Sequence, residues 1–263
     1  MSAKKDKVDR KLQKKHTEAL LGDKLTEDVH NFRVNRSDFI IYVGGDPGHL
    51  ESHSDLELGE PGVEYMMANR FEANLHLLSS IDPKRPLVVV MSSCGGDMEA
   101  GLQMFGALLT CPNPTTVIAT KWARSMTSII PLAADRFYIR PPAQYMYHHG
   151  QYATYGLDQE AQTNDIERRK SRELMFRIYV ARLKEQGKYR SKPPKWIRKK
   201  LDSLIRKHID VWFSADEAVE WGFADAIWDG SSKNKRAQKV NHARRKLMME
   251  VLRRPINVEV KIS

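Results

Sequence analysis

Two strand–turn–helix units follow one another in the middle of the chain, and they constrain the fold more than any other feature. The first begins with the continuous apolar run 87–91, typical of a strand buried on both faces, and a glycine-containing turn leads from it to a helix expected over 98–109. The second has a strand over 115–119, a turn that contains Ser125, and an apolar helix over 126–134. Such units form parallel sheets with right-handed crossovers. The sequence therefore predicts an α/β protein.

Apolar patterning predicts further elements around this centre. A strand is expected over 38–43 and a helix over 63–80, where apolar residues recur at steps of three and four. A long charged helix is expected over 157–187. A Ser-x-x-Glu capping box at 214–217 predicts a short helix that begins there, and residues 223–228 are expected to form a last strand.

Charge is distributed unevenly along the chain, whose net charge is +10. Residues 1–24 contain eight Lys and Arg against four acids, and residues 229–263 contain ten against three. We therefore expect a basic N-terminal arm over 1–30, one folded domain over 31–230 and a basic C-terminal tail over 231–263. Basic arms bind nucleic acid or an acidic protein face, or they are simply solvated. Solvation is the preferred interpretation, because no aromatic residues alternate with the charges as in single-strand binders.

Composition also bears on compartment and cofactors. No apolar stretch approaches the about 18 residues needed to cross a membrane, and the N-terminus lacks the apolar core of a signal peptide. We therefore expect a cytoplasmic protein with no membrane partner. Cys94 and Cys111 are the only cysteines, too few for a disulfide framework, and no nearby Cys/His pair has zinc spacing. The sequence thus predicts free thiols, no metal and no other cofactor.

Four places along the chain carry residues suited to a reaction. Gly95 and Gly96 lie between a buried strand and a helix, where backbone N–H groups can approach an anion, although paired glycines also form ordinary turns. Ser125 has a similar position, where a serine is most often a helix N-cap. His148 ends an apolar segment and is either a general base or a half-buried side chain without a role. Asp210 precedes Val-Trp-Phe. It is either a carboxylate whose orientation is fixed by these apolar neighbours or an ordinary residue of a surface turn.

Five segments, in order, match one set of motifs. They are Met91-Ser92-Ser93-Cys94-Gly95-Gly96-Asp97, Ala123-Arg124-Ser125-Met126, Leu132-Ala133-Ala134 with Arg136-Phe137, Tyr145-Met146-Tyr147-His148, and the block from Asp210 to Gly222. These segments resemble motifs of the Clp protease proteolytic subunit family, and the resemblance covers about residues 36–229. The last block is the most specific, since it resembles the family's Asp-x-x-x-Ser-Ala-x-Glu-Ala followed by Glu-Tyr-Gly.

The resemblance implies a fold and an activity. The fold would be that of Clp proteolytic subunits and crotonases, with repeated β-β-α units, a parallel sheet and a protruding helical handle. The activity would be that of a serine endopeptidase, with Ser125 as nucleophile, His148 as general base and Asp210 as the orienting carboxylate. Backbone N–H groups of Gly96 and Met126 would form the oxyanion hole. These residue types suit the chemistry, because serine needs a base and the base needs a third group that fixes its tautomer.

The same resemblance implies partners. They are unfolded polypeptides or peptides as substrates, a homo-oligomeric ring that encloses the active sites, and an AAA+ unfoldase that feeds it. Met175, Phe176 and Tyr179 lie beyond a single apolar stripe of the 157–187 helix, which favours an interface unless these residues complete the core. Nucleic acid is a further candidate partner, through the basic arms.

Several residues depart from the family's motifs. Cys94 replaces the proline before the paired glycines, and Arg124 replaces the alanine or serine before the nucleophile. Thr127 replaces the glycine after Ser-Met, where a side chain could crowd the turn. His149 stands where the family usually has glutamine. These departures bear on substrate and partner more than on the catalytic candidates.

Other functions fit parts of the sequence. A signal-peptide-peptidase type of enzyme would use Lys121 with Ser125, but the two are close in sequence and the block that begins at Asp210 would have no role. A crotonase-type acyl-CoA enzyme shares the paired-glycine turn and needs no serine triad. An inactive copy that serves as a scaffold, and a phage-type protease of capsid maturation, are the remaining alternatives.

Overall fold

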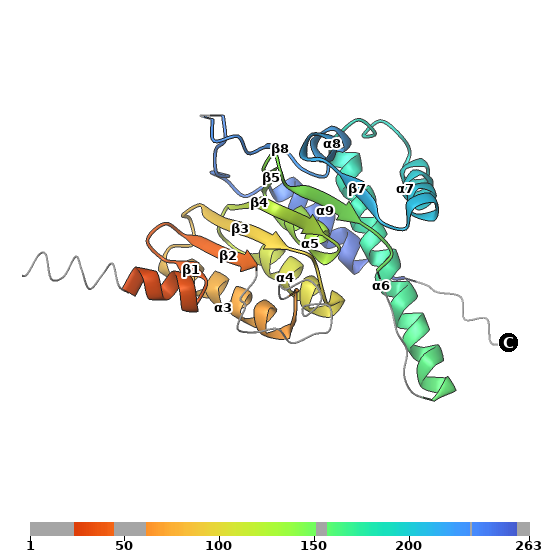
Figure 1. Cartoon of the computed structure of the whole chain (residues 1–263), viewed down its shortest axis with the longest axis horizontal. Coiled ribbons are helices and arrows are strands. Elements are labelled where there is room, and N and C mark those ends of the chain that lie inside the picture. Colours follow the sequence, from red (N-terminus) through yellow and green to blue (C-terminus); the bar gives the residue numbers. More distant parts are fainter. Residues whose placement is uncertain (1–23, 45–61, 151–156, 232, 257–263) are drawn as a thin grey trace, which may run out of the picture.

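The structure is a computed structural model of the chain, and it describes residues 24–44, 62–150, 157–231 and 233–256. An eight-stranded sheet lies at its centre (Figure 1). The strands are β1 (Val34–Asn35), β2 (Ile40–Gly44), β3 (Leu87–Ser93), β4 (Thr115–Arg124), β5 (Arg136–Ile139), β6 (Gln144–Tyr147), β7 (Val211–Phe213) and β8 (Ala226–Ile227). The labelled helices are α3 (Tyr65–Ile81), α4 (Met98–Thr110), α5 (Met126–Ile129), the 3-10 helix η1 (Ile130–Ala133), α6 (Asp158–Glu185), α7 (Pro194–His208), α8 (Ala215–Trp221) and α9 (His242–Arg253). Residues 24–31, at the start of the described part, are helical as well.

The middle of the sheet is parallel, which confirms the α/β fold. Strands β2, β3, β4, β5 and β8 are neighbours in this order, and each adjacent pair is parallel. The apolar run at the start of β3 is buried except for Val90, which is half-buried, so both faces of the strand are largely covered. Strand β1 adds an antiparallel edge.

Strand β4 is longer than the sequence pattern predicts, because its two halves pair with different partners. Residues 116–119 pair with β5, whereas residues 122–124 pair with β6. Strand β6 in turn pairs with β7 in antiparallel orientation. A small branch of strands therefore leaves the main sheet, and the ends of β4, β6 and β7 meet in it.

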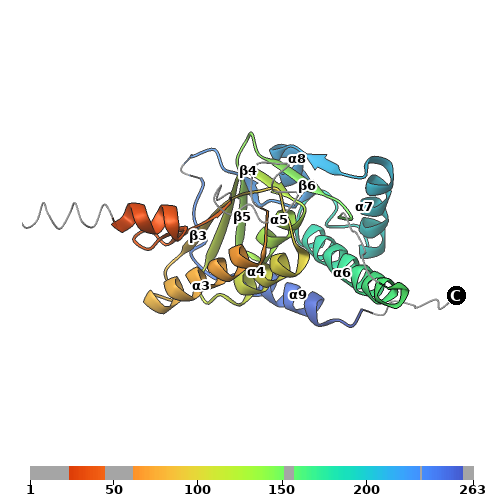
Figure 2. The ribbon, with the colours of Figure 1, turned by 60° about the horizontal axis from the view of Figure 1, so that its bottom comes forward.

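Helices and a chain segment cover the two sides of the sheet. Figure 2 shows α3, α4 and α9 together on one side, where the main core lies. The other side carries a smaller apolar cluster built around Val88, Ile118 and Tyr138. The segment after β8 crosses this side, because the Tyr138 hydroxyl donates to the Lys235 carbonyl at 3.0 Å and the Ala237 N–H donates to Thr116 Oγ1 at 2.7 Å.

Several local predictions are confirmed and one is modified. The Ser214 and Glu217 side chains cap α8 reciprocally, at 3.2 and 2.8 Å, and Gly222 ends that helix in the left-handed region. The helix expected over 126–134 is instead the single turn α5 followed by η1. Pro131 lies in the first turn of η1 and has no N–H to donate to a longer α-helix.

Helix α6 projects from the body of the molecule and forms the helical handle (Figure 1). Its second half lies in the core, where Met175, Phe176 and Tyr179 are at most 6% exposed. Their place beyond a single apolar stripe therefore does not indicate an interface. These side chains complete the core of the chain itself.

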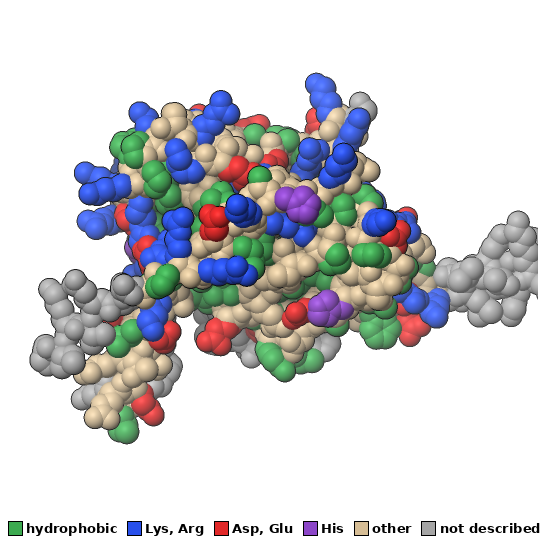
Figure 3. All heavy atoms as spheres, turned by 180° about the vertical axis from the view of Figure 1, so that it is seen from behind, with side chains coloured by type: hydrophobic (Ala, Val, Ile, Leu, Met, Phe, Trp, Pro, Cys, Tyr) green, Lys and Arg blue, Asp and Glu red, His purple; other side chains and the backbone are tan. Residues whose placement is uncertain are grey.

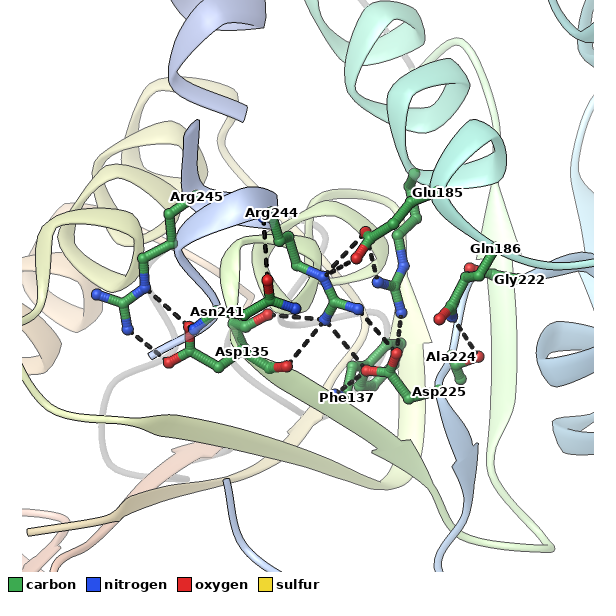
Figure 4. A network of polar contacts seen from close by, with 12 residues as sticks. Asp135, Phe137, Glu185, Gln186, Gly222, Ala224, Asp225, Asn241, Arg244 and Arg245 are labelled. Carbon is green, nitrogen blue, oxygen red and sulfur yellow. Dashed lines mark hydrogen bonds and ion pairs between the residues drawn. The ribbon is translucent and has the colours of Figure 1, made fainter. Parts of the chain in front are cut away.

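Part of the predicted C-terminal tail is folded against the domain. Helix α9 contacts α6, α4 and η1, and its two adjacent arginines reach inward (Figure 4). Arg244 is 4% exposed and Arg245 binds the buried carboxylate of Asp135 at 2.6 Å. These two charges are therefore used inside the protein and not by an external acidic partner. Most of the predicted N-terminal arm lies outside the described residues.

Candidate active site

Ser125 lies on a strained turn between β4 and α5. Its backbone angles are φ 51° and ψ −123°, a left-handed conformation that is uncommon for a residue other than glycine. The Ser125 N–H donates to the carbonyl oxygen of Met146 at 3.0 Å, which attaches the turn to β6. A sharp strand-to-helix turn of this kind projects a serine hydroxyl away from the backbone.

Strand pairing brings His148 and Asp210 to this serine. Arg124 pairs with Met146 in the parallel β4–β6 ladder, so Ser125 and His148 both lie just past the last pair of this ladder. His148 Nε2 is 2.8 Å from Ser125 Oγ. In the antiparallel β6–β7 pair the next ladder step places Asp210 opposite His148, and His148 Nδ1 is 2.9 Å from Asp210 Oδ1. The three predicted side chains thus form one hydrogen-bonded chain.

The paired-glycine turn packs directly on the nucleophile turn. Gly95 has φ 102°, and a Cβ at this position would lie 2.5 Å from Ser125 Cβ and 2.7 Å from the Arg124 carbonyl oxygen. Only glycine fits there. Helix α4 approaches equally closely, since a Cβ on Gly101 would lie 2.5 Å from Met126 Cε.

Two backbone N–H groups remain as donors for an oxyanion. Val63 forms backbone hydrogen bonds to the residues on both sides of Gly96. The Val63 N–H donates to the Gly95 carbonyl at 2.6 Å, and the Val63 carbonyl accepts from the Asp97 N–H at 2.7 Å. Within the described ranges, the N–H groups of Gly96 and Met126 donate to no protein acceptor. They are the two N–H groups that the family resemblance predicts to form the oxyanion hole.

The neighbouring histidine has a different environment. The ring of His149 packs edge-on against Phe176, with centroids 5.3 Å apart, and its Nε2 is 3.9 Å from Asp202. Burial lowers the pKa of His149, and the nearby Arg172 guanidinium lowers it further. Of the two adjacent histidines, His148 is therefore the one in contact with Ser125.

Lys121 is exposed at the surface, where its side chain lies over the Trp122 ring. Its Nζ lies 3.7 Å from the centre of the Trp122 ring. The Ser125 hydroxyl is bonded to an imidazole, so the geometry favours a Ser–His pair over a Ser–Lys pair.

Sequence reasoning missed a stacked row beside the site. The Arg124 guanidinium lies 4.0 Å from the Trp122 ring and 4.5 Å from the Trp212 ring, and its Nη2 donates to Gln144 Oε1 at 2.7 Å. The signal was available, since Arg124 and Trp212 lie one and two residues from catalytic candidates. Finding it required the β4–β6–β7 register, which pairs both residues with Met146.

A basic helix adjoins the site. Helix α7 ends two residues before Asp210, and Figure 3 shows Lys and Arg side chains gathered on the side of the molecule that holds α7 and α8. The exposed cations of α7 include Lys195, Lys199, Arg206 and Lys207. Clustered cations of this kind attract acidic ligands.

Two absences concern the described part of the chain. It contains no group of three or more His, Cys, Asp or Glu side chains placed to hold a metal ion. None of its helices combines the length and apolarity required to span a membrane.

Comparison with known proteins identifies the family. The sequence model of the Clp protease family matches residues 49–231. The "ATP-dependent Clp protease proteolytic subunit 1" of Chlamydia muridarum is 29% identical over 172 residues, which are 64% of this chain and 82% of that protein. The same subunit of Chlamydia trachomatis serovar D is 30% identical over 157 residues (58% and 75%), and the proteolytic subunit of Deinococcus radiodurans is 26% identical over 180 residues (68% and 81%). The chain therefore belongs to the Clp protease family of peptidases.

Proposed function

We propose that this protein is a serine endopeptidase in which Ser125 is the nucleophile, His148 the general base and Asp210 the carboxylate that orients the base. One observation carries the proposal: the hydrogen-bonded chain from Ser125 Oγ through His148 to Asp210, at 2.8 and 2.9 Å. The His148 side chain is only 18% exposed. Water therefore competes little for hydrogen bonds to the imidazole.

Acylation begins with proton transfer. His148 Nε2 takes the proton of Ser125 Oγ as that oxygen attacks the carbonyl carbon of the scissile peptide bond. Asp210 accepts a hydrogen bond from His148 Nδ1–H, which selects the tautomer with a free Nε2 lone pair and stabilises the imidazolium that forms. The tetrahedral oxyanion accepts hydrogen bonds from the N–H groups of Gly96 and Met126, each worth about 3 kcal/mol in the transition state.

Collapse of the tetrahedral intermediate breaks the C–N bond. The imidazolium of His148 gives its proton to the leaving amine, and an acyl ester remains on Ser125. A water molecule then attacks the ester with His148 again as base, and the carboxylic acid product leaves. The chain's own residues supply every proton transfer in this sequence.

We further propose that the substrates are unfolded polypeptides or peptides and that copies of the chain form a ring. The relatives are named as proteolytic subunits of ATP-dependent proteases, which supports assembly with an AAA+ unfoldase. An exposed apolar stripe on α3 supports self-association: Met66, Leu77 and Ile81 are 40–54% exposed and share one helix face. The basic α7 surface favours acidic segments of the substrate.

A fluorophosphonate probe tests the catalytic proposal, since it labels only an activated serine. We expect the wild-type protein to be labelled and to cleave a short fluorogenic peptide. Ser125→Ala should abolish labelling and lower kcat by about 10⁴-fold or more, with an unchanged circular dichroism spectrum. A folded Ser125→Ala variant with full activity would refute the proposal.

A further inference from the structure

The hydroxyl of Thr127 is buried between the two turns of the candidate site. Its Oγ1 is 2.7 Å from the Ser93 carbonyl oxygen and 2.8 Å from the Arg124 carbonyl oxygen, and it accepts a hydrogen bond from the Arg124 N–H at 3.0 Å. A hydroxyl has one proton, so it donates to one of the two carbonyls at a time. Thr127 is fully buried. The side chain therefore fits the turn with protein partners and does not crowd it.

The partners of this hydroxyl are the last residues before the two turns. Ser93 ends β3 and precedes the turn that contains Gly96, and Arg124 ends β4 and precedes Ser125. The β3–β4 ladder is irregular at this point, because its register shifts between Met91 and Ser93. Beyond the shift the ladder resumes with a single pair, Ser93 with Ala123, so few ladder contacts hold the two strands together where the turns begin. The Thr127 hydroxyl spans the two strands there.

We propose that Thr127 is a positioning residue that sets the placement of the Gly96 N–H relative to Ser125 Oγ. It touches no reacting atom and acts through the backbone of Ser93 and Arg124. The inference rests on the proposed function, because the placement matters only if Ser125 is the nucleophile and Gly96 an oxyanion donor. A misplacement of about 1 Å in such a site costs about 100-fold in rate.

Thr127→Val tests this role, because valine keeps the shape and removes the hydroxyl. Thr127→Ser keeps the hydroxyl and removes a methyl group. Thr115→Val is the matched control: Thr115 is also fully buried, lies at the opposite end of β4, and its Oγ1 donates to Asp135 Oδ2 at 3.0 Å. Both valine variants lose a buried hydrogen-bonding hydroxyl, but only one of them adjoins the nucleophile turn.

The readouts are kcat and KM on a short fluorogenic peptide, the rate of fluorophosphonate labelling, and Tm. We expect Thr127→Val to lower kcat by about 10- to 100-fold with little change in KM, and Thr127→Ser to remain within about threefold of wild type. Thr115→Val should lower Tm and leave kcat unchanged. If Thr127→Val does not fold, the smaller Thr127→Ala is measured in its place, with the same expected loss.

Two results would overturn the inference. One is a Thr127→Val variant with wild-type kcat. The other is a loss of kcat in both valine variants in proportion to their loss of Tm, which would reduce Thr127 to a stabilising residue. Failure of the probe to label the wild-type protein would refute the proposed function itself, and the role of Thr127 with it, so the two failures are distinguishable.

Discussion

Arg244 and Asp225 form a two-pronged ion pair, with Nη2 to Oδ1 at 2.9 Å and Nη1 to Oδ2 at 3.2 Å (Figure 4). The same carboxylate accepts from Arg182 Nη2 of α6 at 2.9 Å and from the Phe137 N–H of β5 at 2.6 Å. One half-buried acid thus joins the C-terminal helix, the helical handle and the central sheet. The C-terminal segment is therefore part of the structural support of the domain.

Arg244→Met should destabilise the protein strongly. The variant leaves the Ala134 carbonyl without this donor, and Glu185 and Asp225 each keep only one of their two arginines, Arg182. Removal of one member of a buried ion pair costs about 3–5 kcal/mol. Urea denaturation measures this loss. Arg253→Met, on the same helix but exposed, should change the free energy of unfolding by about 0.5 kcal/mol or less. Equal effects of the two variants would contradict the role of the network.

Stability should fall with acidification in a way that depends on Asp225. Burial alone would raise the pKa of Asp225, but the charges of Arg182 and Arg244 outweigh it and hold the pKa well below its usual range. The folded state therefore binds this proton less readily than the unfolded state, whose pKa is about 3.9. Its stabilising contribution is complete above about pH 5 and is lost as the pH falls below about 4.

Asp225→Asn isolates this contribution. The difference in the free energy of unfolding between wild type and variant should be largest near pH 6 and should shrink as the pH approaches 3. Denaturation curves at several pH values measure it. A difference that is constant from pH 6 to pH 3 would show that ionisation of Asp225 does not stabilise the fold.

His148→Ala and His149→Ala should differ sharply in activity. Only His148 contacts Ser125, so its loss should lower kcat by about 10⁴-fold. His149 lies against Phe176, and its loss should affect stability more than kcat. Peptide hydrolysis and thermal melting of both variants decide the matter. An active His148→Ala variant together with an inactive His149→Ala variant would show that His149, and not His148, is the base.

Gly95→Ala should inactivate the enzyme, because the new methyl group would overlap Ser125 Cβ and the residue has φ 102°. Gly106→Ala on α4 is the matched control. A Cβ there meets no atom within 4 Å, and alanine in a helix is favoured over glycine by about 0.5–1 kcal/mol. Probe labelling should vanish in the first variant and persist in the second, whose Tm should rise. A labelled Gly95→Ala would mean that the two turns can separate without loss of function.

The apolar stripe on α3 predicts self-association. Leu77→Lys places a charge in the stripe. The variant should form smaller species than the wild-type protein, because burial of a lysine without a partner opposes assembly. His76→Lys adds the same side chain at an exposed position outside the stripe. Sedimentation velocity at micromolar concentration compares them. A wild-type protein that stays monomeric and still cleaves peptides would rule out the ring.

Much of the fold follows from local sequence signals. The apolar run of β3, the spacing of α3 and the capping box of α8 each depend on residues close together in the chain, and all three appear in the structure. Strand β7 is not predicted from the sequence, because three residues are too few for an alternating pattern. Helix α9 lies in the predicted basic tail, because Arg244 and Arg245 have the pattern of solvated charges until their acidic partners are known.

Residue type and short spacing are enough to identify the side chains that can react and the elements that carry them. The contacts between these side chains depend on how the strands pair in three dimensions. Ser125 meets His148 only through the β4–β6 ladder, and His148 meets Asp210 only through β6–β7. Likewise Thr127 and Arg244 acquire their roles from buried partners distant in the chain. A buried polar group needs hydrogen-bonding partners, and a local sequence pattern does not show which distant residues will supply them.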